Sequence, residues 1–273
     1  MPPHAFFVVS ALFHYLGPSF AVLLFAHVGV LGVAWLRIAS AAAVFAIWRR
    51  PWRSVVRGDS RSRMLVVALG TTLALMNSVF YLAIDRMPLA TVAAIEFVPT
   101  IAIALIGVRS VRNIVALVVA GVFLLIGFQW SGDKLGVLLA IANAALFAVY
   151  IVIGHAISRA GGASGIDRLG LAMLVALVVA MPIGAADVLP VLSRPTLILA
   201  GIGVGLSSSV IPYVCDQLAM ARLPRATFAL MLTLLPATAT IVGAVVLSQI
   251  PTPAEITGIL LVAAGVYLHK PRQ

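Results

Sequence analysis

Residues 82–91 read LAIDRMPLAT, and residues 218–227, which lie 136 positions later, read LAMARLPRAT. Six of these ten positions are identical, and the match continues at Ala93/Ala229 and Gly107/Gly243. Chance similarity between Ala- and Leu-rich segments is the alternative explanation. The Arg-x-Pro-x-Ala-Thr turn is not a generic apolar pattern, however, so the offset favours an internal repeat of about half the chain.

The composition around this repeat is that of a membrane protein. Of the 273 residues, 63% are hydrophobic and 10% are charged, and the mean hydropathy is +1.16. A soluble domain carries about 25% charged residues, so this chain needs a lipid bilayer as its solvent. The same figures exclude a disordered chain and a coiled coil. The single cysteine, Cys215, excludes an internal disulfide and a cysteine-ligated metal cluster.

Continuous apolar stretches predict an all-α integral membrane fold with ten transmembrane helices, each about 20 residues long. The predicted spans are 5–27, 29–49, 64–84, 88–108, 113–130, 135–157, 169–187, 196–220, 225–248 and 254–269. The weakest is 196–220, which contains three consecutive serines, Pro212 and Asp216. The first segment has no basic region or cleavage site, so we interpret it as a retained helix. Strand-like alternation, typical of an outer-membrane barrel, is absent.

The loop charges predict the orientation. Fourteen Lys and Arg residues fall on the side of the membrane that holds both termini, and three fall on the other side: Arg86, Lys134 and Arg194. This positive-inside bias predicts cytoplasmic termini. It also accounts for the net charge of +10 without a nucleic-acid partner, because the arginines are dispersed over short loops and no recognition module is present.

An offset of 136 residues divides the chain into two five-helix repeats, 1–131 and 132–273. Because five is odd, the second repeat enters the membrane from the opposite side, so the repeats are inverted. Secondary transporters use this plan to enclose a cavity near the bilayer midplane and open it alternately to each side. The repeat therefore favours transport over a pore or an enzyme.

Several motifs resemble the EamA-type drug/metabolite transporters, and in particular their bacterial inner-membrane threonine/homoserine exporter branch. The matching stretches are GPSFA at 17–21, Val28-Gly29, Leu36-Arg37, MNSVFYLAI at 76–84, Met87-Pro88-Leu89, AIEF at 94–97, Ile211-Pro212-Tyr213 and ARLPRATF at 221–228. This resemblance implies two EamA domains, ten helices and export of small amino acids or related metabolites from the cell.

The chain departs from that branch in its second half. Leu234-Leu235 stand where an acid precedes Pro236 in the branch, and Ser248-Gln249 stand where it has Gly-Glu. The proline after Glu-Phe arrives one position early, at Pro99, whereas the acid after Pro-Tyr is retained as Asp216. These losses concern ion coupling and the exact substrate rather than the fold.

Charged side chains inside the hydrocarbon region are costly and often functional. Three fall within predicted spans: Arg37, Glu96 and Asp216. A carboxyl in a dry cavity can bind and release a proton or attract an ammonium group, so Glu96 is the main candidate for coupling. The alternative is a structural ion pair between Glu96 and Arg37. Asp216 has two interpretations, a polar wall of the cavity or a surface residue paired with Arg222.

Uncharged candidates for the cavity lining lie on shared helix faces. Asn77 and Tyr81 are four residues apart, and the pairs Phe147/Tyr150 and Tyr213/Asp216 are three apart. Such side chains can recognise an amino acid, or they can simply join helices by hydrogen bonds. His14 and His155 are weaker candidates, because a lone membrane histidine is usually satisfied by a backbone carbonyl.

We therefore expect an exporter of small neutral amino acids that works by alternating access and is driven by protons. We expect no cofactor and no metal, since no ligand motif is present. The expected partners are the solute, protons and the lipid bilayer, and the chain is expected to act as a monomer or a homodimer. The alternatives are a drug or phosphate-bearing solute, for which only Arg37 supplies a fixed cation, and an integral membrane transferase.

Overall fold

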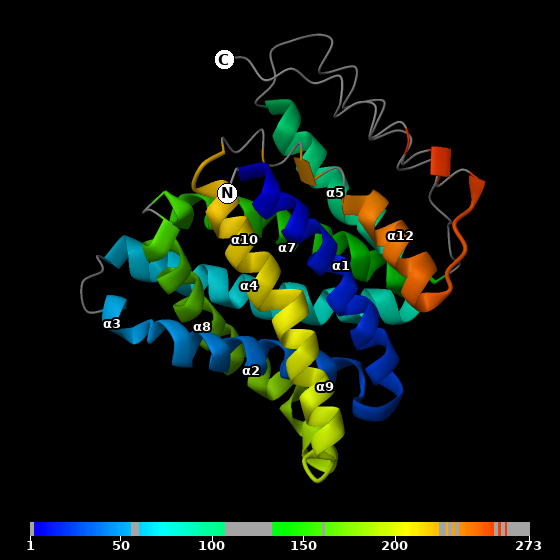
Figure 1. Ribbon diagram of the computed structural model, residues 1–273, viewed down its shortest axis with the longest axis horizontal. Coiled ribbons are helices and arrows are strands. Elements are labelled where there is room, and N and C mark those ends of the chain that lie inside the picture. The colour runs from blue at the N-terminus through cyan, green and yellow to red at the C-terminus, as the bar shows by residue number, and fades with distance from the viewer. Residues whose placement is uncertain are drawn as a thin grey trace.

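A computed structural model describes residues 3–55, 60–106, 133–159, 162–223, 228, 231–232, 235–253, 256–257 and 260. All regular secondary structure in these residues is helical (Figure 1). Within the described part of the chain, six helical segments are long and apolar enough to cross a membrane: Ala5–Val28, Val30–Arg49, Ser60–Arg86, Lys134–Ser158, Ser164–Val191 and Pro195–Met220. The prediction of a helical membrane protein is confirmed in this part of the chain.

The helices follow the expected spans closely. The first predicted repeat contains α1 (Pro3–Val28), α2 (Val30–Arg49), the short α3 (Trp52–Val55), α4 (Ser60–Arg86) and α5 (Leu89–Ile106). The second contains α7 (Lys134–Ser158), α8 (Gly162–Val188), the 3-10 turn η1 (Leu189–Val191), α9 (Pro195–Gly205), the π-helical turn η2 (Leu206–Val210), α10 (Ile211–Met220) and α12 (Leu235–Leu247). The span expected at 113–130, and nearly all of 254–269, lie outside the described residues, so the number ten remains a prediction.

The eighth expected span, 196–220, had the weakest apolar pattern in the sequence. In the structure it is one continuous helical path from Pro195 to Met220. Its serine run does not break the helix but forms η2, the wider π-helical turn. Pi-helical turns inside α-helices are rare and often mark functional positions. The polar run therefore alters the backbone geometry in the middle of the span.

The helices pack in pairs that are far apart in sequence. α2 lies along α8, α4 packs against α7 and α8, and α1 packs against α9, η2 and α10. In Figure 1 the blue α1 lies beside the yellow α9–α10 path, and α5 lies beside α12. α5 also contacts α7, and α12 also contacts α1. These pairs bring residues of both predicted repeats to the centre of the bundle.

Small residues allow the closest of these contacts. A Cβ atom on Gly17 of α1 would lie 2.4 Å from the Cβ of Ser208 in η2 and 2.6 Å from its backbone nitrogen. A Cβ on Gly205 would lie 2.8 Å from the carbonyl oxygen of Arg37 in α2. Glycine at these two positions thus lets η2 pack directly between α1 and α2.

The outer surface is apolar. Several large hydrophobic side chains are well exposed, among them Ile47 at 80%, Val178 at 70% and Val245 at 79%. The polar and charged side chains Arg37, Asn77, Glu96, Asn143 and Asp216 are instead buried. This arrangement, with an apolar outside and polar groups within, suits a protein whose surroundings are lipid.

Candidate functional site

Arg37 is held in the centre of the bundle by η2. Its side chain is 3% exposed. Nε donates to the hydroxyl of Ser209 at 2.7 Å, and Nη2 donates to the backbone oxygen of Ser208 at 2.6 Å. Because Gly17 and Gly205 bring η2 close to α1 and α2, the serine run supplies the acceptors that this buried cation needs.

Two tyrosines flank the same guanidinium. Its central carbon lies 5.3 Å from the ring centroid of Tyr81 and 5.9 Å from that of Tyr213. Nη2 also donates to the hydroxyl of Tyr213 at 3.3 Å. Cation–π contacts add to hydrogen bonds when the cation is removed from water. Arg37 is therefore fixed by contacts from α4, η2 and α10.

Tyr213 joins this arginine to α4. Its hydroxyl donates to the side-chain oxygen of Asn77 at 3.1 Å. The amide nitrogen of Asn77 donates in turn to the backbone oxygen of Leu73 at 2.7 Å. These bonds fix the orientation of the Asn77 amide and of the Tyr213 phenol, and they connect the two predicted repeats across the centre.

Glu96 is 2% exposed and is held by two polar side chains of other helices. Asn143 of α7 donates to its Oε1 at 2.9 Å, and Tyr15 of α1 donates to its Oε2 at 3.2 Å. Both Glu96 and Arg37 belong to the described residues, and no ion pair within 4.0 Å joins them. The alternative expectation of a locked Arg37–Glu96 pair is therefore wrong for this conformation.

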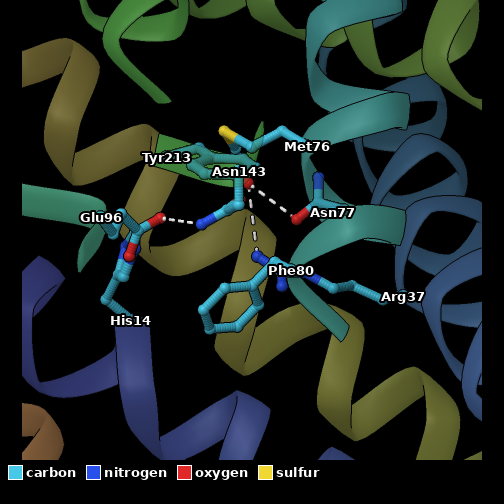
Figure 2. A pocket seen from close by; sticks show the side chains of 8 residues that line it. All are labelled: His14, Arg37, Met76, Asn77, Phe80, Glu96, Asn143 and Tyr213. Atoms are coloured by element: carbon cyan, nitrogen blue, oxygen red, sulfur yellow. Dashed lines mark hydrogen bonds between the residues drawn. The ribbon is translucent and has the colours of Figure 1, made fainter. Parts of the chain in front are cut away.

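A small cavity separates the two charged groups. Its lining side chains, drawn in Figure 2, are His14, Arg37, Met76, Asn77, Phe80, Glu96, Asn143 and Tyr213. The free space has room for about one water molecule. Figure 2 shows Glu96 and Arg37 approaching the cavity from opposite sides. One cavity thus presents an anion, a cation and two amides, and it must widen to admit a solute.

A second polar cluster surrounds Asp216 in α10. Its carboxylate accepts a hydrogen bond from Ser10 of α1 at 2.5 Å and another from Tyr150 of α7 at 3.0 Å. Asp216 is only 2% exposed, which contradicts the interpretation that it reaches the surface. The Tyr150 ring lies 5.7 Å from that of Phe147 and 5.5 Å from that of Tyr213.

The eight candidate residues therefore divide into two groups. Four line the cavity: Arg37, Asn77, Glu96 and Tyr213. The other four are buried next to it without forming its wall: Tyr81, Phe147, Tyr150 and Asp216. The spacing arguments placed Asn77 and Tyr81 on one side of α4 and Phe147 with Tyr150 on α7, and in both pairs the two side chains are buried together.

Sequence reasoning missed Asn143 and Tyr15, the two partners of Glu96, and gave little weight to His14. His14 lines the cavity, with its ring 5.3 Å from that of Tyr15 and 5.9 Å from that of Phe147. A signal for Asn143 did exist. It lies four residues before Phe147 on α7, so it shares a face with two aromatic candidates.

The site combines two opposite charges that form no ion pair with each other. Among the described residues no group of three His, Cys, Asp or Glu side chains could hold a metal ion. The cavity instead offers a fixed guanidinium and a carboxylate that do not neutralise each other. A solute that carries both an anionic and a cationic group complements this pair.

Comparisons with known proteins show that this chain is similar to membrane transporters. The model of the EamA-like transporter family matches residues 134–269. The threonine/homoserine exporters RhtA of Salmonella typhimurium (strain SL1344) and Escherichia coli (strain K12) are each 32% identical to this chain over 254 residues. These alignments cover 91% of this chain and 84% of each relative. A crystal structure of another protein has the same fold, with a TM-score of 0.59, 18% identity and 94% of each chain covered.

Proposed function

The chain belongs to the EamA-like transporter family, and we propose that it exports small neutral amino acids such as threonine or homoserine. The relatives are exporters, so the chain is a multi-pass membrane transporter rather than an enzyme. The observation that supports an amino acid as the solute is the unpaired arrangement of Arg37 and Glu96 around one cavity. An amino acid is a zwitterion with charges to match both groups.

In this proposal Arg37 binds the carboxylate of the solute and Glu96 binds its ammonium group. Arginine has five N–H donors, and the contacts of Arg37 with Ser208, Ser209 and Tyr213 leave donors for a substrate carboxylate. Asn143 and Tyr15 keep the Glu96 carboxylate in place when no ammonium is bound. In this conformation the cavity has room for about one water molecule, so it must widen before the solute can reach both groups.

We further propose that export is coupled to protons through Glu96. A buried carboxylate is most easily neutralised by a proton or by an ammonium group, and one carboxylate holds only one of them at a time. A proton that enters from outside therefore releases the amino acid, and loss of this proton to the cytoplasm restores binding. This exchange couples the inward proton gradient to outward movement of the solute.

Alternating access would come from two inverted halves, residues 1–131 and 132–273, with both termini in the cytoplasm. The packing supports this division: α7 packs on α4 as α1 packs on α10, and α5 meets α12. A shift of 136 residues carries α1 approximately onto α7, α4 onto the α9–α10 path and α5 onto α12, so it exchanges the first two pairs and interchanges the members of the third. Rocking of one half against the other would open the cavity first to one side and then to the other.

Flux through proteoliposomes tests the proposed function. Vesicles that contain the protein should exchange labelled threonine or homoserine, and a pH gradient should drive accumulation. We expect Glu96→Gln to abolish both, whereas Asp85→Asn, an acid at the exposed end of α4, should behave like the wild type. Glu96→Asp, which keeps the charge, should retain part of the activity. Normal gradient-driven flux by a folded Glu96→Gln protein would contradict the proposal.

A further inference from the structure

We propose that Asp216 is a second proton-binding site, separate from the solute cavity, whose protonation state is transmitted through Ser10 and Tyr150. This proposal rests on the proposed transport function, because it assigns a second coupling proton to the same cycle.

Hydroxyl groups of two other helices hold the Asp216 carboxylate. Its two oxygens accept from Ser10 of α1 and Tyr150 of α7, both of which donate through hydroxyl groups. On its own helix the nearest titratable groups are Tyr213 and Cys215, and neither is a cation. α8 also packs against α10, but its Asp167 is paired with Arg49 at 2.7 Å.

Among the residues that the structure describes, no cation lies within ion-pair distance of Asp216, so its ionised form has no balancing charge there. A buried carboxylate in this situation is costly, and a proton is the simplest way to neutralise it. Glu96 differs, because it shares its cavity with Arg37 and has space beside it for a solute. The structure thus contains one buried acid suited to a zwitterion and one suited to a proton.

Ser10 has two acceptors within reach and a single hydrogen to donate. Its hydroxyl oxygen lies 2.5 Å from Asp216 Oδ1 and 3.3 Å from the backbone oxygen of Pro212. When Asp216 is ionised, Ser10 donates to the carboxylate. When a proton from water binds at Oδ1, the new O–H group donates to the Ser10 oxygen, and the Ser10 hydrogen turns to Pro212.

Protonation therefore changes the joint between α1 and α10. A charge-assisted hydrogen bond, the stronger kind, is replaced by two neutral ones. One of these ends on Pro212, whose carbonyl belongs to the first turn of α10, beside η2. The change moves the Ser10 hydrogen from the side chain of Asp216 to the backbone of Pro212, so it rearranges the contact between α1 and α10, which in the proposed architecture joins the two halves.

Two tyrosines, Tyr150 and Tyr213, connect Asp216 to the solute cavity. Tyr150, which donates to Asp216, has its ring 5.5 Å from the ring of Tyr213. Tyr213 accepts from Arg37 and donates to Asn77, and all three line the cavity. A shift of Tyr150 when Asp216 gains or loses its proton would reach the arginine through one intervening ring.

Infrared difference spectroscopy of the full-length protein in lipid measures the proton directly. With Glu96→Gln as the background, which removes the carboxyl of the solute cavity, a change of pH should produce a protonated-carboxyl band that is absent when Asp216→Asn is added and retained when Cys215→Ser is added as the neighbouring control. Ser10→Ala removes a donor to the ionised form, so the transition should move to higher pH. Ser10→Thr keeps the hydroxyl and should restore the wild-type transition. An unchanged band in Asp216→Asn overturns the proposal.

Threonine accumulation against a pH gradient, with the membrane potential clamped at zero, measures the coupling. One proton per threonine supports up to about tenfold accumulation per pH unit, and two protons support up to about a hundredfold. We expect the Asp216→Asn protein to bind threonine with normal affinity. Its maximal threonine accumulation should fall from about a hundredfold to about tenfold per pH unit. Accumulation equal to that of the wild type overturns the proposal.

The two assays separate this proposal from the proposed function. If the wild-type protein does not move threonine or homoserine, the proposed function fails. The infrared band still decides whether Asp216 takes up a proton. If threonine moves but the Asp216→Asn protein keeps both the band and the full accumulation, the exporter proposal stands and the second proton site is refuted.

Discussion

The hydroxyl of Tyr213 donates a hydrogen bond to the side-chain oxygen of Asn77 at 3.1 Å, across a sequence separation of 136 residues. The same separation aligns residues 82–91 with 218–227. Tyr213 is therefore bonded to the residue that occupies its own position in the other predicted repeat. In the proposed architecture of two inverted halves, equivalent residues meet only at the axis that relates them, and the solute cavity lies beside this bond.

A double-mutant cycle measures this central bond. Asn77→Ala and Tyr213→Phe should each lower the free energy of unfolding in mixed micelles, and the double mutant should lose less than the sum. The coupling expected for a hydrogen bond between membrane helices averages about 0.6 kcal/mol and reaches about 1.7 kcal/mol. Combining Tyr213→Phe with Thr72→Val, which removes a bond local to α4, should give additive losses. Additivity of the Asn77 cycle would exclude a contribution from this bond.

Gly17→Ala should destabilise the protein and weaken threonine binding together. The added methyl group would lie within 2.7 Å of three atoms of Ser208, two of them in the backbone, so η2 must move. Overpacking of this kind costs about 1–3 kcal/mol, and the displaced Ser208 oxygen would release Arg37. Gly203→Ala is the control, since no atom lies within 4 Å of a Cβ at that position. Equal stability of the two variants would refute the packing argument.

Asp133 should make stability depend on pH in the acid range. It caps the first turn of α7, and the backbone N–H of Gly136, with help from Arg86, lowers the pKa of its carboxyl below the ordinary value. The ionised cap therefore stabilises the folded protein above about pH 4, and the effect disappears as the pH falls through the lowered pKa.

Thermal unfolding of the wild type and of Asp133→Ala checks this cap. The midpoints should differ by a constant amount between neutral pH and about pH 5, and the difference should shrink below about pH 4. Asp133→Asn keeps a capping oxygen without the charge, so it should lose less than the alanine variant. A difference that grows at low pH would contradict the assigned sign.

Ser248→Gly should stabilise the end of α12. Ser248 follows this helix with φ 54°, a left-handed conformation that costs a non-glycine residue about 1 kcal/mol. The next residue, Gln249, donates its backbone N–H to Gly243 and accepts from the backbone of Leu89 at the start of α5. Ser248→Ala keeps the strain and should bring no gain in denaturant stability. A gain for alanine equal to that for glycine would show that strain is not the cause.

The apolar spans could be predicted from the sequence because a bilayer requires them, and their ends could not. α4 begins at Ser60 and α8 at Gly162, four and seven residues before the expected spans. Hydropathy detects only the part of a helix that lies in the hydrocarbon region. Polar turns such as the one around Asp167, which pairs with Arg49, continue the helix beyond it.

The site was predictable in its residue types but not in its pairing. Charged residues are rare and costly within apolar membrane spans, so Arg37, Glu96 and Asp216 could be identified from the sequence. Their partners depend on which helices touch. Asn143 is 47 residues from Glu96, and Ser10 is 206 residues from Asp216. An opposite charge is the partner that electrostatics alone suggests for Glu96, but in the folded chain an amide and a phenol take that place.

The most direct test of the central claim is to compare binding of threonine with two analogues, threoninol, which lacks the carboxylate, and 3-hydroxybutanoate, which lacks the amine. The purified wild-type protein should bind each analogue at least about tenfold more weakly than threonine, a difference of about 1.4 kcal/mol. In Glu96→Gln the penalty for the missing amine should vanish, while the penalty for the missing carboxylate should persist. Equal binding of all three ligands by the wild type, or an unchanged amine penalty in Glu96→Gln, would contradict a zwitterion held between Arg37 and Glu96.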